Sequence, residues 1–177
     1  MKRITTSLLL QACCAPCSSA VLEKLTTDYA LTLVYFNPNI QPETEYQKRL
    51  REFQKLKNKF SFNLLVPKYD PADWLAVTKD YAQEPEGGQR CQICIDYRLD
   101  YTAKLARNYD AFSTTLSISP YKNLAQIDQA GRAAAQKHNV NFIEFNFRDL
   151  YPRSVELSQE LGLYRQKYCG CLYAKDS

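Results

Sequence analysis

The 177-residue sequence has few glycines, one histidine and no long apolar run. Its five glycines form neither the phosphate loop G-x-x-x-x-G-K-S/T nor the dinucleotide fingerprint G-x-G-x-x-G, so neither kind of nucleotide-binding loop is visible. His138 is the single histidine, which gives little support to histidine-based metal sites or Cys–His nucleophile pairs. No apolar stretch has the length of a membrane span, and the run at 8–10 is too short for a signal peptide. We therefore expect a cytoplasmic protein with no membrane partner.

Seven cysteines stand out in a chain that is large enough to bury a core without disulfides. An odd number argues against a framework of disulfides alone, and cytosolic cysteines are normally thiols. They fall into three groups: Cys13, Cys14 and Cys17; Cys91 and Cys94; and Cys169 and Cys171. Clustered cysteines in the cytosol indicate metal or redox chemistry.

Predicted strands alternate with predicted helices along the chain. Apolar runs predict strands at 4–12, 31–36, 62–66, 112–116 and 140–145. Helical spacing predicts helices from Pro16, at 43–60, 72–82 and 94–109, and from Ser119-Pro120 to about His138. This order favours an α/β fold, a parallel sheet with helices on both faces, whose loops after the strands hold the chemistry. We expect a single domain over 1–177 with an irregular, cysteine-bearing C-terminal extension at about 146–177.

The first cysteine group lies at a predicted turn from strand to helix. In Cys13-Cys14-Ala15-Pro16-Cys17, the start of the helix supplies free N–H groups and a partial positive charge, which stabilise thiolates. That favours metal ligation or redox attack. The ordinary alternative, small buried side chains at a turn, suits one cysteine better than three in five residues.

The second group is a C-x-x-C sequence that the loop 84–88 delivers just before a predicted helix. Cys91 and Cys94 can reach one metal ion or one iron–sulfur cluster, and with the first group they can supply four thiolates. Zinc and iron–sulfur clusters both accept four thiolates, so the spacing leaves the two open.

Cys169-Gly170-Cys171 forms the third group. A disulfide across one intervening residue closes a small, strained and easily reduced ring, which suits an electron relay. Two further metal ligands, or two incidental thiols, are equally compatible with the pattern.

The net charge of +4 permits a nucleic-acid partner without requiring one. On the predicted helix 43–60, a basic stripe of Lys48, Arg51, Lys55 and Lys59 could follow a phosphate backbone, or could be an ordinary solvated face. Some of the thirteen tyrosines could stack on bases, although most tyrosines of a folded domain belong to its core and rim. The candidates for stacking are Tyr35, Tyr69, Tyr81, Tyr97, Tyr121, Tyr164 and Tyr168.

Several separate motifs occur in an order that closely resembles the QueH family of epoxyqueuosine reductases over nearly the whole chain. They are Cys13-Cys14-Ala15-Pro16-Cys17, Tyr35-Phe36-Asn37-Pro38-Asn39-Ile40, Glu86-Gly87-Gly88 with Arg90-Cys91 and Cys94, Thr114-Thr115-Leu116 with Ser119-Pro120-Tyr121-Lys122, and Tyr164-Arg165-Gln166-Lys167-Tyr168-Cys169-Gly170-Cys171. One departure is Gln41, where histidine is usual in the family.

The resemblance implies an iron–sulfur enzyme whose α/β fold is similar to the adenine-nucleotide hydrolase (HUP-like) group but lacks its ATP-binding glycine loop. By motif, Cys13, Cys14, Cys91 and Cys94 would hold a 4Fe-4S cluster, and Cys169 with Cys171 would be the redox-active pair. A second iron ion would lie beside the cluster, with Cys17 and Asp70 as candidates for its shell.

The implied reaction is a two-electron reduction that removes the epoxide oxygen of epoxyqueuosine in the tRNA anticodon wobble position and gives queuosine. The substrate would be tRNA bearing epoxyqueuosine, and an external electron donor of flavodoxin or ferredoxin type would supply electrons. Tyr121 and Lys122 are the candidates for the proton donor, because they lie in a matching motif near a helix start.

Two other hypotheses remain open at this point. One is a zinc-stabilised tRNA-binding or partner-binding module in which Cys13, Cys14, Cys91 and Cys94 close a structural site without redox activity. The other is a thiol oxidoreductase that uses Cys169 and Cys171 on protein substrates, which their spacing favours less because it differs from the C-x-x-C of thioredoxin-like proteins.

Overall fold

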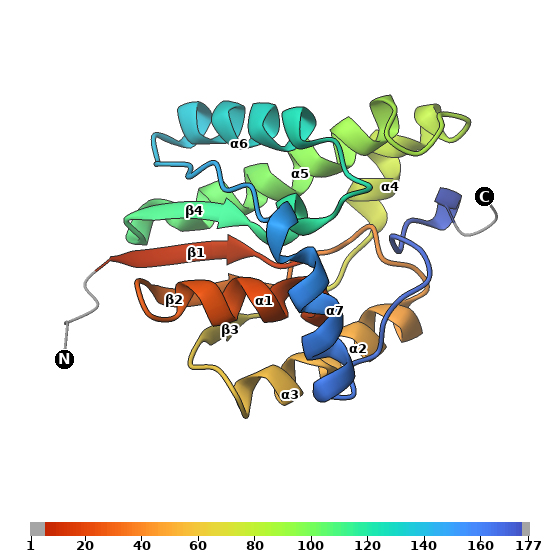
Figure 1. Ribbon diagram of the computed structural model, residues 1–177. Coiled ribbons are helices and arrows are strands. Elements are labelled where there is room, and N and C mark those ends of the chain that lie inside the picture. Colours follow the sequence, from red (N-terminus) through yellow and green to blue (C-terminus); the bar gives the residue numbers. More distant parts are fainter. Residues whose placement is uncertain (1–5, 175–177) are drawn as a thin grey trace.

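Four parallel strands form the sheet at the centre of the computed structural model, which describes residues 6–174 (Figure 1). The strands are β1 (Ser7–Gln11), β2 (Ala30–Val34), β3 (Asn63–Leu65) and β4 (Ala111–Thr114), in the spatial order β3-β2-β1-β4. All three pairings are parallel, which confirms the predicted α/β fold with a parallel sheet. Residues 4 and 5 of the predicted first strand lie outside the described residues. The likeness to the HUP-like group stays a prediction with which this strand order is compatible.

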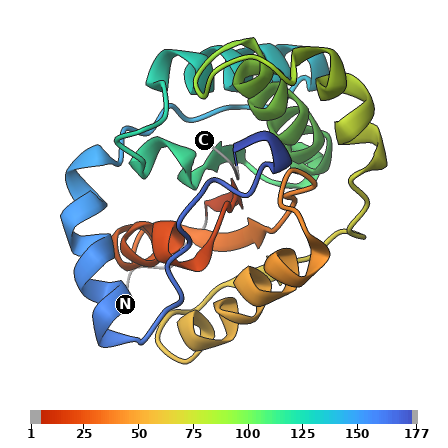
Figure 2. The ribbon, with the colours of Figure 1, turned by 90° about the vertical axis from the view of Figure 1, so that its right-hand side faces the viewer.

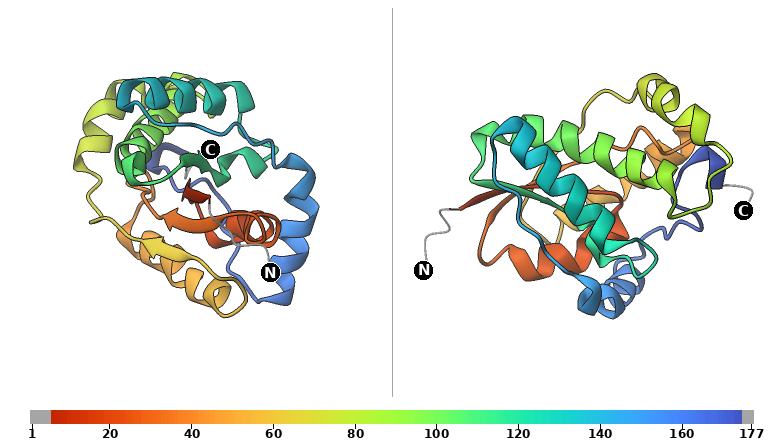
Figure 3. Two further views of the ribbon diagram at one scale, coloured as in Figure 1. Left: turned by 90° about the vertical axis from the view of Figure 1, so that its left-hand side faces the viewer. Right: turned by 90° about the horizontal axis from the view of Figure 1, so that it is seen from above.

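Helices cover both faces of the sheet, as predicted. The α-helices are α1 (Ala15–Leu25), α2 (Glu43–Arg51), α3 (Phe53–Lys57), α4 (Ala72–Thr78), α5 (Gln89–Leu105), α6 (Leu124–His138) and α7 (Tyr151–Glu160). Short 3-10 helices occupy Lys79–Tyr81, Ala106–Asn108, Thr115–Ile118, Arg148–Leu150 and Leu172–Ala174. Helices α5 and α6 pack together on one side of the sheet, and α1 packs against α7 on the other (Figures 1 and 3). No helix among residues 6–174 is long and apolar enough to cross a membrane.

Strand β1 shows how the sequence produces this layering. Its leucines alternate between the faces: Leu8 and Leu10 belong to the core under α1 and α7, whereas Leu9 belongs to the core under α5 and α6. All three are fully buried, and each contributes roughly 1.5–3 kcal/mol through burial of its side chain. A continuous apolar run is what a strand covered on both faces requires.

Two predicted helices, 43–60 and the one from Ser119-Pro120, have other bounds in the structure. The predicted helix 43–60 is divided into α2 and α3 at Glu52, whose carboxylate accepts the backbone N–H of Tyr164 at 2.8 Å and so anchors the C-terminal segment. Helix α6 begins later than Ser119-Pro120, because the side chain of Asn123 caps it by accepting the N–H groups of residues 125 and 126.

The predicted strand 140–145 was also wrong, since it forms only a single bridge between Phe112 and Phe142. Beyond the bridge, the carbonyl oxygen of Ile143 accepts the hydroxyl of Ser113 at 2.7 Å.

Strand order creates a switch point between β1 and β4. The chain continues from β1 to β2 and β3 on one side, then returns to place β4 on the other side of β1. Loops after these two strands separate at the carboxyl edge, where α/β proteins commonly bind ligands. Here the N–H of Cys13, which follows β1, donates to Thr115 Oγ1, which follows β4, at 3.3 Å.

The segment 161–174 after α7, called the tail here, runs back across the carboxyl edge of the sheet (Figure 2). Arg49 of α2 holds it by donating from Nη1 and Nη2 to the carbonyl oxygens of Cys169 and Tyr168, each at 3.1 Å. The carbonyl oxygen of Gly170 accepts the N–H of Gln41 at 2.8 Å. These bonds bring the last cysteine group to the edge where the first lies.

Candidate metal and redox site

A cavity of about 380 Å³ lies at the carboxyl edge of the sheet, between α1, α5 and the tail. Six of the seven cysteines line it: Cys13, Cys17, Cys91, Cys94, Cys169 and Cys171. The seventh, Cys14, is buried directly behind Cys13. All three cysteine groups predicted from the sequence therefore meet at one place.

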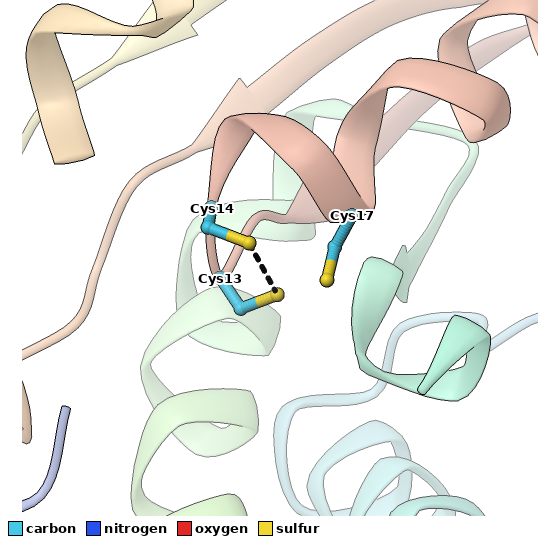
Figure 4. Close-up of side chains that lie close together, drawn as sticks. All are labelled: Cys13, Cys14 and Cys17. Atoms are coloured by element: carbon cyan, nitrogen blue, oxygen red, sulfur yellow. Dashed lines mark hydrogen bonds between the residues drawn. The ribbon is translucent and has the colours of Figure 1, made fainter. Parts of the chain in front are cut away.

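Cys13, Cys14 and Cys17 form a compact triad at the start of α1 (Figure 4). Their sulfur atoms lie within 4.8 Å of one another, and those of Cys13 and Cys14 are 3.8 Å apart. Cys14 is the N-cap residue, and Pro16 fits the first turn, where no N–H is needed. Gln166 of the tail donates to the sulfur of Cys14 at 3.0 Å. The triad offers soft ligands in a group that can hold a metal ion.

The triad is set up to carry negative charge at Cys13. Hydrogen bonding with Cys14 and Cys17 lowers the pKa of Cys13, and the nearby Arg98 guanidinium lowers it further, although burial opposes this. The same bonding to Cys13 raises the pKa of Cys14 to about 12 and raises the pKa of Cys17. The first proton therefore leaves from Cys13.

Cys91 and Cys94 come from the first turns of α5, which corrects the predicted loop. The helix begins at Gln89 and not near Cys94, because Gly88 acts as N-cap and its carbonyl oxygen accepts the N–H of Cys91 at 3.0 Å. The sulfur of Cys91 accepts the N–H of Gly87 at 3.2 Å. Cys94 packs beside Trp74 and Cys171. Two helix N-termini thus present thiols to the same cavity, although Cys91 and Cys94 are not part of the compact triad.

Three buried arginines belong to the site, and their burial was not predicted from the sequence. Arg49, Arg90 and Arg98 all line the cavity, and each is at most 4% exposed. Arg49 is paired with Glu45 at 2.7 Å, whereas Arg98 donates to the Asn37 side chain at 2.6 Å and has no acidic partner among the described residues. A buried cation without a carboxylate is costly unless another anion offsets it. The thiolates of the cavity supply such negative charge.

Cys169 and Cys171, both free thiols, flank Gly170 in a tight bend of the tail. Gly170 has φ of +108°, a conformation that side chains rarely adopt. A Cβ there would lie 2.7 Å from Ile40 Cγ1 and 3.0 Å from Arg49 Nη1. The bend therefore requires glycine for its backbone and for space.

We expect Gly170→Ala to lower the free energy of unfolding by about 2–4 kcal/mol, since strained backbone and overpacking each cost about 1–3 kcal/mol. Gly162→Ala is the matched control, because Gly162 also has positive φ but no atom within 4 Å of a Cβ, and it should cost about 1 kcal/mol. Urea unfolding of the metal-free proteins measures both. Equal losses would show that the contact with Ile40 and Arg49 does not constrain the bend.

The two thiols of the tail differ in acidity. A hydrogen bond from Cys171 and the positive charge of Lys122 lower the pKa of Cys169 to about 6, although burial opposes this. The same hydrogen bond, together with burial, raises the pKa of Cys171. Burial disfavours the charged form of Lys122, but the charges of Cys169, Cys91 and Glu86 outweigh it and raise the Lys122 pKa. At neutral pH, one member of the pair is thus a thiolate and the other a thiol.

In the metal-free protein, we expect the alkylation rate of Cys169 to rise with pH and to reach half its maximum near pH 6, because the thiolate is the reacting form. Cys171 should react more slowly throughout. Peptide mass spectrometry after brief exposure to iodoacetamide measures both rates. Lys122→Met should move the Cys169 midpoint to higher pH and Lys104→Met should not; an unchanged midpoint in Lys122→Met contradicts the role given to this lysine.

Other residues singled out in the sequence fall in different places. Lys122 and Tyr121 line the cavity, whereas Asp70 is exposed, accepts the N–H of Ala72 just before α4 at 3.1 Å, and does not line it. Gln41 is buried next to the tail, and neither amide atom of its side chain has a hydrogen-bond partner among residues 6–174.

The basic stripe is largely engaged within the chain. Its contacts are Lys48 Nζ over the Tyr164 ring (3.5 Å from the centroid), Lys55 Nζ to Glu52 and to the Gly162 carbonyl oxygen (2.9 and 2.7 Å), and Lys59 Nζ to Glu160 (3.5 Å). Three of its four cations therefore stabilise the docking of α2 and α3 against α7 and the tail.

The chemistry of the lining fits a thiolate-ligated metal group. Sulfur donors come from two helix starts, and buried arginines balance their charge. Thiolate donors suit an iron–sulfur cluster and zinc alike. Fold and site together define an α/β protein with a cysteine-lined cavity at its topological switch point, a class in which thiolates serve as metal ligands or redox groups.

Comparison with known proteins identifies the family. The family "Epoxyqueuosine reductase QueH" matches residues 8–177, and the chain belongs to it. It is 40% identical to the epoxyqueuosine reductase QueH of Thermotoga maritima, covering 95% of this chain and 90% of the relative. The QueH of Streptococcus pyogenes is 37% identical, with 97% and 71% covered, and that of Dehalococcoides mccartyi is 35% identical, with 95% and 92% covered.

Proposed function

We propose that residues 1–177 form one catalytic domain, an epoxyqueuosine reductase that acts on tRNA. It removes the epoxide oxygen of epoxyqueuosine at the anticodon wobble position and leaves the cyclopentene ring of queuosine. The observation that carries the proposal is the convergence of six cysteines on one cavity of about 380 Å³, in a chain of the QueH family. The balance of the reaction is one epoxide, two electrons and two protons giving one alkene and one water.

Cys13, Cys14, Cys91 and Cys94 would hold a 4Fe-4S cluster, and Cys17 is the candidate ligand of a second iron. When bound, this group supplies low-potential electrons and a Lewis-acidic metal for the epoxide oxygen. Asp70, exposed and outside the cavity lining, is the weaker candidate for that iron. The start of α1 favours the thiolate of Cys13, whereas burial raises the pKa of Cys94, so ligation would have to release the Cys94 proton.

Lys122 is the proton donor that the surroundings favour. Its Nζ lies 3.5 Å from Glu86, and the nearby thiolates keep it protonated. It lines the same cavity as the cysteines, so a charged ammonium group is available where an epoxide oxygen would leave as water.

Cys169 and Cys171 form the redox-active pair. Oxidation of the pair to a disulfide releases two electrons and, because Cys169 is already a thiolate, one proton; the Lys122 ammonium supplies the second proton that one epoxide consumes and regains it from water. Cys169 is the thiolate member of the pair and carries the lower pKa. An external donor of flavodoxin or ferredoxin type would then return two electrons, and we propose the cytoplasm as the location, because such donors and tRNA occur there.

The test is the reduction of tRNA carrying epoxyqueuosine by anaerobically purified protein with a chemical or flavodoxin-type reductant. Nucleoside mass spectrometry should show queuosine, and the protein should be brown, with iron and sulfide. A colourless, zinc-loaded protein that binds tRNA would instead support the structural module, and no conversion by iron- and sulfide-replete protein would overturn the reductase.

A further inference from the structure

Tyr121 lines the cavity yet lies largely in solvent. It is 79% exposed, whereas the next most exposed large apolar residue among residues 6–174, Leu172, is 49% exposed. Within the described part of the chain its ring contacts one other aromatic ring, the edge of Tyr151, with centroids 6.5 Å apart and planes at 89°. A large aromatic side chain that the fold leaves open at a cavity mouth indicates a contact with a partner.

The backbone around Tyr121 is fixed on both sides. Its N–H donates to Ser119 Oγ at 3.3 Å, and the next carbonyl oxygen, that of Lys122, accepts Nη2 of Arg148 at 2.6 Å. The ammonium group of Lys122 lies 3.5 Å from the carboxylate of Glu86. The exposed ring is therefore presented by an ordered loop, and little conformational entropy is lost when a planar group stacks on it.

Two cationic side chains line the same cavity as the Tyr121 ring. Arg165 and Lys167 of the tail are exposed and line the same cavity as Tyr121. Glu86 is the single acidic residue among the lining residues, and it is paired with Lys122. Arg165 Nη1 donates to Ser158 Oγ at 3.2 Å, and among residues 6–174 neither Arg165 nor Lys167 is paired with a carboxylate. An aromatic plane and such cations around one cavity are the combination that binds unpaired nucleotides, because bases stack on the ring and phosphates meet the cations.

Resting on the proposed function, we infer that the rim formed by Tyr121, Arg165 and Lys167 binds the single-stranded loop that carries the substrate base. A base that enters the cavity leaves its neighbours in the strand unstacked, and Tyr121 offers one of them a replacement stacking surface. Lys167 and Arg165 meet the adjacent phosphates. The basic stripe of α2 and α3 is the poorer candidate, because three of its four cations have partners within the chain.

The experiment measures binding of a labelled, unmodified anticodon stem-loop RNA to the anaerobically purified protein by fluorescence anisotropy. Tyr121→Ala should weaken binding about tenfold, whereas Tyr121→Phe, which keeps the stacking plane, should stay within about twofold of the unsubstituted protein. Tyr81→Ala is the matched control, because Tyr81 is an exposed tyrosine outside the cavity lining and should leave binding unchanged.

Salt dependence tests the cations of the rim. Lys167→Glu should reduce the slope of log K against log salt by at least about 0.7, the value for one single-strand phosphate contact, whereas Lys104→Glu should leave it unchanged. Wild-type affinity in Tyr121→Ala, equal losses in Tyr121→Ala and Tyr81→Ala, or equal binding of a fully paired RNA duplex would each overturn the inference. Binding needs no epoxide, so these outcomes are separate from failure of the reductase itself, which shows as absent conversion of epoxyqueuosine tRNA.

Discussion

Cys94→Ser is expected to remove most of the iron and sulfide and to lower the rate of epoxide reduction by at least about a hundredfold. A serine hydroxyl is a hard, protonated group at neutral pH and replaces a thiolate poorly at iron. Cys94 packs against the fully buried Trp74, so water has little room to take its place. Iron and sulfide assays, the visible spectrum and the rate with epoxyqueuosine tRNA measure the loss.

Cys17→Ser is the matched variant, because it tests which thiols belong to the cluster. The sulfur of Cys17 lies within 4.8 Å of those of Cys13 and Cys14, whereas Cys94 comes from the other helix. We expect Cys17→Ser to keep the sulfide and the visible spectrum but to lose the second iron, so that the iron-to-sulfide ratio falls. The reverse pattern, with sulfide lost in Cys17→Ser and kept in Cys94→Ser, would assign the cluster to the triad.

Cys169→Ser is expected to keep iron and sulfide and yet to reduce turnover on the order of a hundredfold or more. One thiol cannot form the disulfide that releases two electrons, and the cluster ligands are untouched. Steady-state rates and the visible spectrum of the same preparation separate the two effects.

The double substitution of Cys169 and Cys171 tests whether the two thiols act together, because their effects on the rate should then not add. Cys171→Ser should match Cys169→Ser, and the double substitution should be no slower than either, because the two residues act as one unit. Additive losses would mean that the thiols act independently, and an unchanged rate in either single variant would remove them from the reaction.

Four of the five predicted strands are present, because short apolar runs such as 8–10 between turn signals are typical of strands buried on both faces. The first cysteine group follows β1 and therefore lies at the carboxyl edge of the sheet, whereas the other two groups reach that edge from α5 and the tail. The start of α5 was misjudged because Gly87-Gly88 is typical of a loop, whereas Gly88 closes the first turn of the helix. In a sequence, a glycine at an N-cap position looks the same as a glycine in a loop. In the structure, the N–H of Cys91 donates to the carbonyl oxygen of Gly88, so the helix has already begun there.

The burial of the arginines of the site could not be predicted from residue type, since arginine is normally exposed. A signal was present in the spacing: Arg90, Cys94 and Arg98 recur every four residues and therefore share one face of α5. Arg49 has a local partner four residues earlier, Glu45, but such pairs are common on exposed helix faces, and its other partners are carbonyl oxygens of the tail, more than a hundred residues later. Long-range bonds to the backbone leave no trace in local sequence.

The tail also sets an order of events during biosynthesis. The ribosome delivers the sheet, α1 and α5 before residues 165–171, which form one wall of the cavity. Cys13, Cys17, Cys91 and Cys94 come from the starts of helices made before that wall, and Gln166 joins the two parts by donating to the sulfur of Cys14. We therefore expect the cavity to take its full shape only when the tail docks on helices that have already folded.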